Sequence, residues 1–293
     1  MLLETSDIIK KVRQIEIKTR GLTNQIFSGQ YHSAFRGKGM TFSEVREYQY
    51  GDDIRSIDWN VTARFNHPYI KIFDEERELT VMLLIDVSGS NEFGTQKQFK
   101  EELMTEVAAV LAFSAIQNND KVGVIFFSDR IEKFIPPKKG TTHILRIIRE
   151  LIDFKPQSQK TDISEALKFL NNVLKKRSVA FVLSDFIDRN FYDAMKRSAR
   201  KHDLIALRIF DPSESQLPRL GMVQMYNKEE GKSIWVDTSG EAARKHYQNW
   251  WKETEKYIQS AFTRCGVDNA TLQTDRDYIK PLTNLFRTRG SRR

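Results

Sequence analysis

The chain has 293 residues, a formal net charge of +8 and a composition of 40% hydrophobic and 29% charged residues. That composition is typical of a folded globular protein and excludes a disordered or fibrous chain, and the length suits one large domain or two small ones. The positive charge alone does not indicate nucleic-acid binding, because basic residues serve many purposes and no zinc finger, helix-turn-helix or RNA-stacking motif accompanies them.

One cysteine, Cys265, excludes a disulfide framework and a cysteine-rich metal site, and suits a reducing compartment. The first residues carry acid where a signal peptide has basic residues, and no apolar run approaches the roughly 20 residues of a membrane helix. We therefore expect a cytoplasmic protein without stable membrane insertion.

Residues 1–78 form an N-terminal extension that we expect to pack on the main domain. Its first stretch, Leu3 to Ile17, is helix-like, and Gly51-Asp52-Asp53 indicates a turn. Tyr69 to Phe73 has the pattern of a strand, which we expect to lead into the main sheet.

Residues 79–293 alternate short apolar runs with longer helical patterns. Continuous runs rich in Val, Ile, Leu and Phe indicate strands buried on both faces, which occur in parallel sheets. Apolar residues at spacings of three and four predict the intervening helices. The strands are expected at Thr80 to Ile85, Val122 to Phe127, Val179 to Leu183 and Leu204 to Phe210, and the helices at Lys97 to Gln117, Ile144 to Ile152 and Ile163 to Leu174. This order predicts a doubly wound, mainly parallel α/β fold.

The remaining segments extend this domain. Arg130 to Ile135 alternates apolar and polar residues as an edge strand does, and we expect it to form a hairpin with the preceding strand. A second hairpin is expected from Met222–Tyr226 and Ser233–Val236, followed by a helix from Glu241 to about Phe262. The basic end of the chain suits a solvated tail, with docking onto an acidic partner or nucleic acid as alternatives.

Polar residues collect where the predicted strands end, and they suggest a metal site. Asp86, Ser88 and Ser90 leave the first strand at two-residue intervals, and Asp185 follows the third. Thr161 lies before a helix, and Asp162 competes with it both as a ligand and as the cap of that helix. Ligands of open α/β sheets bind at the carboxyl ends of the strands. Oxygen donors of this kind suit Mg²⁺ or Mn²⁺, with Ca²⁺ as a third possibility.

These residues resemble the metal-ion-dependent adhesion site of von Willebrand factor type A domains. That site has Asp-x-Ser-x-Ser on its first loop, a Thr on a second and an Asp on a third. By resemblance, Asp86, Ser88 and Ser90 match the first element, Thr161 the second and Asp185 the third. The alternative interpretation is that such residues only form turns and helix caps.

A second resemblance covers nearly the whole chain. Phe35-Arg36-Gly37-Lys38-Gly39, Arg46-Glu47-Tyr48 and the stretch from Gly51 through Trp59 to Arg64 are similar to the prokaryotic family called domain of unknown function 58. Members resemble type A domains with an N-terminal extension and typically accompany AAA+ ATPases of the MoxR type. The resemblance implies such an ATPase and an unknown client protein as partners.

The charged residues of that stretch have three interpretations. Arg46, Arg55 and Arg64 could pair with Asp52, Asp53 and Asp58 around Trp59 and hold the segment against a neighbouring domain. Alternatively, they form a partner-binding face or, least expected, a catalytic group.

We therefore expect a non-enzymatic, divalent-metal-dependent protein-binding module. A phosphate-processing hydrolase is the first alternative, because an Asp after a parallel strand beside Mg²⁺ suits phosphoaspartate chemistry. However, Ser88 stands where haloacid-dehalogenase-like phosphatases need a second Asp. A nucleic-acid adaptor is the second alternative, and it has no supporting motif.

Overall fold

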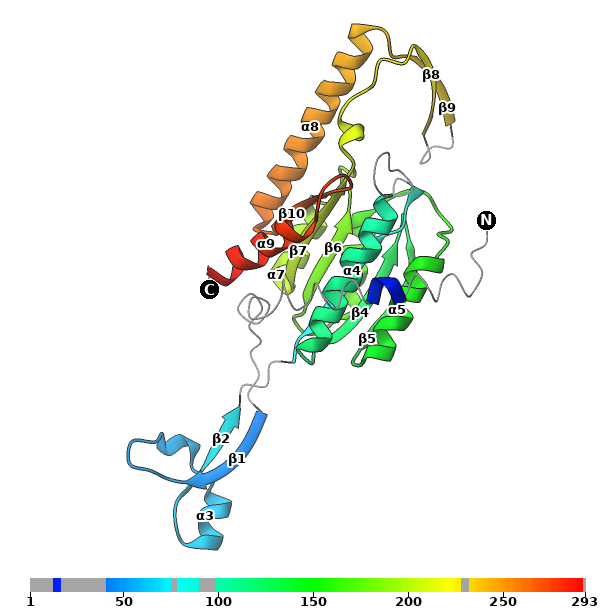
Figure 1. Cartoon of the computed structure of the whole chain (residues 1–293). Coiled ribbons are helices and arrows are strands. Elements are labelled where there is room, and N and C mark those ends of the chain that lie inside the picture. The colour runs from blue at the N-terminus through cyan, green and yellow to red at the C-terminus, as the bar shows by residue number, and fades with distance from the viewer. Residues whose placement is uncertain (1–12, 17–40, 75–77, 90–98, 228–231, 292–293) are drawn as a thin grey trace. The chain divides into compact units, whose positions relative to one another are not determined.

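A computed structural model describes residues 13–16, 41–74, 78–89, 99–227 and 232–291. The chain divides into two compact units, Arg36–Leu79 and a larger one that contains Thr80–Arg293 (Figure 1). Of the expected N-terminal helix, the described residues 13–16 are helical and the remainder lies outside the described residues. No helix among the described residues has the length and apolar character needed to cross a membrane.

The larger unit is built on one six-stranded sheet with the order β10-β7-β6-β3-β4-β5. All neighbouring strands are parallel except β5, which runs antiparallel to β4. The strands are β3 (Thr80–Asp86), β4 (Lys121–Phe127), β5 (Ile131–Lys138), β6 (Val179–Ser184), β7 (Asp203–Phe210) and β10 (Asp268–Gln273). The predicted doubly wound, mainly parallel α/β fold is therefore confirmed.

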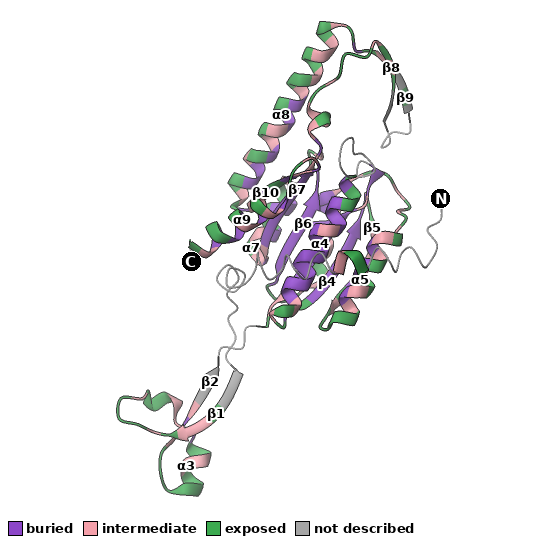
Figure 2. Ribbon diagram, in the orientation of Figure 1, coloured by how far each residue is buried: buried purple, intermediate pink, exposed green. Residues whose placement is uncertain are grey.

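The strands are buried because helices cover both faces of the sheet. The α6, α7 and α8 helices share one hydrophobic cluster with Met82 and Leu84 of β3. On the opposite face, the α4 and α5 helices lie in front of the sheet in Figure 1, and Figure 2 shows the strands between the layers as buried. The helices are α4 (Lys100–Gln117), α5 (Thr141–Asp153), α6 (Ile163–Val173), α7 (Tyr192–Lys201), α8 (Glu241–Cys265) and α9 (Ile279–Ser291). The short η3 helix (Pro212–Ser215) follows β7.

The C-terminal segment differs from the solvated tail that its charge suggested. It forms the edge strand β10 and the helix α9, whose Leu282 and Phe286 are fully buried. Arg289 is also buried, because its guanidinium bonds the carboxylates of Asp203 and Asp268. The basic residues of this end therefore include a structural cation within the fold.

Residues between β7 and α8 form the expected second hairpin, with β8 (Met222–Asn227) antiparallel to β9 (Lys232–Asp237). Its first strand follows the glycine Gly221, which has φ of +79°. The predicted helix after this hairpin is α8, which ends at Cys265 and is followed by Gly266, whose left-handed φ of 63° suits a glycine cap.

The smaller unit contains a two-stranded antiparallel sheet of β1 (Thr41–Glu47) and β2 (Tyr69–Asp74). Between them lie the short η1 helix (Ile54–Ser56) and the α3 helix (Trp59–Phe65). The expectation that Tyr69 to Phe73 enters the main sheet was wrong, because β2 pairs with β1 instead. The predicted turn at Gly51 is present, with φ of +109°.

Candidate functional site

The candidate site lies at the carboxyl ends of β3 and β6, which are neighbours in parallel register. Asp86 is the last residue of β3, and Asp185 follows Ser184, the last residue of β6. The chain leaves these two strands toward opposite sides of the sheet, so this is the topological switch point at which open α/β sheets bind ligands.

Asp86 is 1% exposed and is held by its neighbours. Its Oδ2 accepts a hydrogen bond from the Ser184 hydroxyl at 2.7 Å, and its Oδ1 accepts one from the Ser88 amide at 3.0 Å. Burial, followed by the negative charge of Asp185, raises the pKa of Asp86 to about 6 despite these hydrogen bonds. Ionised Asp86 is therefore destabilised in the folded protein.

The loop after β3 continues with Ser88, which is buried at 2% exposure. The next residue, Gly89, donates its amide to the Gln159 carbonyl at 3.0 Å, so the loop before α6 lies against the loop after β3. Thr161 belongs to that second loop and is half-buried. Ser90 lies outside the described residues.

The structure settles which of two residues caps α6. Asp162 accepts a hydrogen bond from the Glu165 amide at 3.0 Å and is the N-cap. Its own amide donates to the Ser128 carbonyl at 2.9 Å. The capping role therefore belongs to Asp162 and not to Thr161, which the sequence left open.

Asp185 is bonded on both carboxylate oxygens. Its Oδ2 accepts from the Lys100 ammonium at 3.1 Å, and its Oδ1 accepts from the Ile187 amide at 3.0 Å. The following residue, Phe186, has a left-handed φ of 59°, which is strained for a bulky side chain. Phe186 is fully buried and packs edge-to-face on Phe262 with ring centroids 5.0 Å apart. Aromatic packing thus holds the turn that positions Asp185.

Lys100 is a residue of the candidate site that the sequence analysis did not identify. Its side chain is fully buried, and its ammonium bonds both Asp185 and, at 2.6 Å, Glu214. Burial disfavours the ammonium, but the two carboxylates outweigh burial and raise the pKa of Lys100. Its spacing of three and seven from Leu103 and Val107 places it on the buried face of the helix, which is the signal that could have identified it.

Asp188 is the second residue that the sequence did not single out. Its carboxylate accepts the Ile163 amide at 3.1 Å and the Asn190 amide at 2.8 Å. Burial raises its pKa, and the charges of Asp162 and Asp185 add to that effect. Asp188 therefore ties the segment after β6 to the start of α6 and adds a further acidic group to this end of the sheet.

A cavity of about 350 Å³ adjoins Asp86 and Ser88 between α4 and the segment that follows α5. Its apolar lining includes Met104 and Phe154, and its polar lining includes Glu101. A cavity of mixed polar and apolar lining thus adjoins the two buried residues Asp86 and Ser88.

The described residues contain no group of three His, Cys, Asp or Glu side chains placed to hold a metal ion. A metal at this place would therefore depend on hydroxyl oxygens as well as on carboxylates. Asp86 and Ser88 meet that requirement, and Thr161 lies on the loop held beside them. Asp185 fits less directly, because Lys100 already compensates its charge.

The charged residues of the smaller unit lie apart from the candidate site in the sequence. Arg46 binds Asp52 through two hydrogen bonds of 2.7 and 2.8 Å. Asp53 caps η1 by accepting the Arg55 amide at 2.9 Å. Within the described residues, Arg46 thus pairs with one of these aspartates, whereas Arg55 and Arg64 pair with none of them.

Asp58 has two structural roles in the same unit. It caps α3 by accepting the Asn60 and Val61 amides, and it pairs with Lys71 at 3.4 Å. Trp59, the first residue of α3, is 67% exposed, and Arg64 lies in the last turn of that helix.

Comparison with known proteins gives one family and several uncharacterised relatives. The family model described as "Protein of unknown function DUF58" matches residues 44–257. The uncharacterized protein Rv1480 of Mycobacterium tuberculosis is 26% identical over 283 residues, which cover 95% of this chain and 88% of that protein. The uncharacterized protein YeaD of Bacillus subtilis is 27% identical over 122 residues, covering 42% of this chain and 27% of that protein.

Among solved structures, the chain is similar to an aerotolerance-related membrane protein from Bacteroides fragilis that carries multiple mutations to serine. The TM-score is 0.51 at 17% identity, with 73% of this chain and 100% of the other covered. At that identity the likeness concerns the fold alone, and it agrees with the α/β architecture described above.

Proposed function

This chain belongs to the family of proteins of unknown function DUF58, and we propose that it is a non-enzymatic, divalent-metal-dependent docking module acting in the cytoplasm. Its partners would be a MoxR-type AAA+ ATPase and a client protein that the ATPase remodels. One observation carries the proposal. Asp86 is buried beside Asp185 next to a cavity, with its pKa raised to about 6. A carboxylate in that setting is stabilised when a cation binds to it.

Each residue of the site would contribute a different group to a bound cation. Asp86 would supply a carboxylate oxygen, and Ser88 and Thr161 would supply hydroxyl oxygens. Asp185 would contribute mainly its charge, because its oxygens accept from Lys100 and Ile187. Oxygen donors of this kind suit Mg²⁺ or Mn²⁺, and Ca²⁺ less strictly. The bound ion would supply a coordination position for an Asp or Glu of the partner.

The partnership with an ATPase is supported by family membership and by the resemblance that the sequence shows. The cavity beside Asp86 adds a physical argument for protein docking, because its lining combines Met104 and Phe154 with polar groups. A partner acid flanked by an apolar side chain would match that lining.

The metal is tested by calorimetric titration of Mg²⁺ and Mn²⁺ into the wild-type protein and Asp86→Ala. Asp153→Asn is the matched control, since it removes an exposed carboxylate at the end of α5. We expect saturable binding to the wild type and the control and none to Asp86→Ala. Equal binding to all three proteins would contradict the proposal.

The partner is tested by size-exclusion chromatography of this protein with a purified MoxR-type ATPase, with Mg²⁺ and with a chelator. We expect the wild-type protein to form a complex in Mg²⁺ that dissociates when chelator is added. We expect no complex with Asp86→Ala. A complex that persists in chelator and also forms with Asp86→Ala would mean that docking does not use this site.

A further inference from the structure

The two edges of the six-stranded sheet differ in how they are protected. The edge strand β5 has the sequence Ile-Glu-Lys-Phe-Ile-Pro-Pro-Lys. Prolines and lysines are the residues that block the pairing of an edge with another strand. The opposite edge strand, β10, reads Asp-Asn-Ala-Thr-Leu-Gln and has neither. Among the described residues, β10 pairs with β7 alone.

Hydrogen bonding identifies which backbone groups face the open side of β10. The Thr274 amide donates to the Phe210 carbonyl of β7 at 3.1 Å. The backbone N–H and C=O groups of successive residues in a parallel strand point to opposite sides. The backbone groups of even-numbered residues of β10 therefore bond β7, and those of odd-numbered residues face outward. Asn269 and Thr271 therefore direct their N–H and C=O groups away from the sheet, and within the described residues no backbone bond reaches them.

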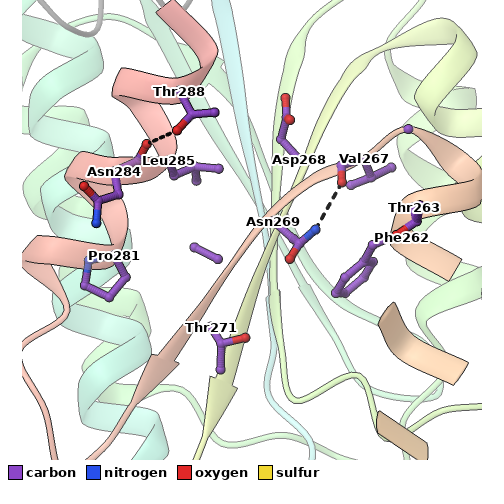
Figure 3. Close-up of a pocket in the computed structure, with 12 residues that line it drawn as sticks. Phe262, Thr263, Val267, Asp268, Asn269, Thr271, Pro281, Asn284, Leu285 and Thr288 are labelled. Atoms are coloured by element: carbon purple, nitrogen blue, oxygen red, sulfur yellow. Dashed lines mark hydrogen bonds between the residues drawn. The ribbon is translucent and has the colours of Figure 1, made fainter. Parts of the chain in front are cut away.

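A groove of about 590 Å³ runs along this edge between two helices. Figure 3 shows Phe262 and Thr263 of α8 on one side and Asn284 and Leu285 of α9 on the other, with β10 between them. The lining is uncharged except for Asp268, and that carboxylate is bonded to Arg289 at 2.6 Å. The groove thus offers backbone groups at its floor and small polar or apolar side chains at its walls.

The helix along this groove is basic. The α9 helix contains no Asp or Glu, and its Lys280 and Arg287 are exposed and make no ion pair within the described part of the chain. The Arg287 guanidinium donates to Asn284 Oδ1 at 3.2 Å, which places that cation beside a residue of the groove lining. The rim on the α9 side is therefore positively charged.

From these observations we propose that β10 is a docking edge for an extended, acidic peptide segment of a partner protein. The segment adds to the sheet as a seventh strand, and its carboxylates meet Lys280 and Arg287. A second copy of this chain fits less well, because antiparallel pairing of two β10 edges brings α9 against its symmetry mate and sets like charges together. This surface does not require the metal of the proposed function.

The first test uses peptides about eight residues long with alternating Thr or Val and glutamates at both ends. Fluorescence anisotropy with the full chain should give saturable binding that persists in chelator. Peptides N-methylated at alternate residues should bind at least about tenfold more weakly. Thr271→Pro removes one outward amide, and it should abolish binding, whereas Thr271→Val keeps the amide and should bind as the wild type does. Thermal unfolding verifies that both variants fold.

The second test reverses the charge. The double variant Lys280→Glu, Arg287→Glu should no longer bind the acidic peptides. It should instead bind peptides that have lysine in place of glutamate. Absence of saturable binding throughout the panel at about 1 mM, or binding indifferent to Thr271→Pro, overturns the proposal. A dimer that Thr271→Pro dissociates would also overturn it, because the occupant would be a second copy.

Discussion

Replacing Asp86 with Asn should stabilise the metal-free protein at neutral pH. The pKa of Asp86 is raised from 3.8 to about 6 by burial and by the charge of Asp185. At about 1.4 kcal/mol for each pKa unit, ionised Asp86 costs about 3 kcal/mol of stability well above pH 6. Asn removes this cost, because its amide oxygen still accepts from Ser88 and its amide group can donate to Ser184.

The sign of the pH dependence follows from the raised pKa. The folded state binds its proton more tightly than the unfolded state, so the contribution of Asp86 is fully present below about pH 4 and is lost as the pH rises through about 6. The difference in the free energy of unfolding between Asp86→Asn and the wild type should therefore increase as the pH rises between these two values, and it should remain constant at higher pH. Part of the gain is lost to imperfect hydrogen bonding of the amide, so about 1 to 3 kcal/mol is expected.

The assay is urea unfolding followed by tryptophan fluorescence in chelator across this pH range, with Asp153→Asn as the control. Groups common to both proteins cancel in the comparison. Equal stability of wild type and Asp86→Asn at about pH 7.5, or a difference that grows toward acid, would refute the electrostatic reasoning.

Three other substitutions test the surroundings of the site. Lys100→Met should destabilise the protein by about 3 to 5 kcal/mol in denaturant unfolding, because it leaves the buried Asp185 and the half-buried Glu214 without their ammonium; a loss below about 1 kcal/mol would contradict this. Arg289→Met should cost less, about 1 to 3 kcal/mol, because the carboxylates of Asp203 and Asp268 lose their guanidinium but are partly exposed to water, and an unchanged midpoint would show that α9 does not depend on these pairs. Phe186→Ala should be less stable than Phe186→Gly by about 1 kcal/mol, because both lose the aromatic packing but only glycine relieves the left-handed φ; the reverse order would remove the strain argument.

The parallel core could be predicted from the sequence because its signal is local. Residues such as Val81 to Ile85 form a continuous apolar run, and a strand buried on both faces requires that run. The edge strand β10 lacks this signal. Its residues are mostly polar, and its backbone is ordered by pairing with β7 and by α9 rather than by β propensity.

The candidate site could be predicted where its residues follow strands and could not where distant residues meet. Asp86 and Asp185 are placed by the rule that ligands gather at strand ends. Lys100 bonds Asp185 and Glu214, which are 85 and 114 residues away in the sequence, so its ion pairs follow from the packing of α4 on the sheet. The position of Lys100 on an otherwise apolar helix face indicates that its ammonium is buried, but it does not identify the carboxylates that bind it.

The charge balance of the strand ends links the stability argument to the proposed function. Burial and the charge of Asp185 raise the pKa of both Asp86 and Asp188, whereas the buried Lys100 ammonium bonds Asp185 and Glu214. Binding of Mg²⁺ and the substitution Asp86→Asn would both relieve the cost of ionised Asp86, so their stabilising effects should not add. Saturating Mg²⁺ should raise the unfolding midpoint of the wild type and leave that of Asp86→Asn unchanged. An equal rise in both proteins would place the ion elsewhere and separate the raised pKa of Asp86 from metal binding.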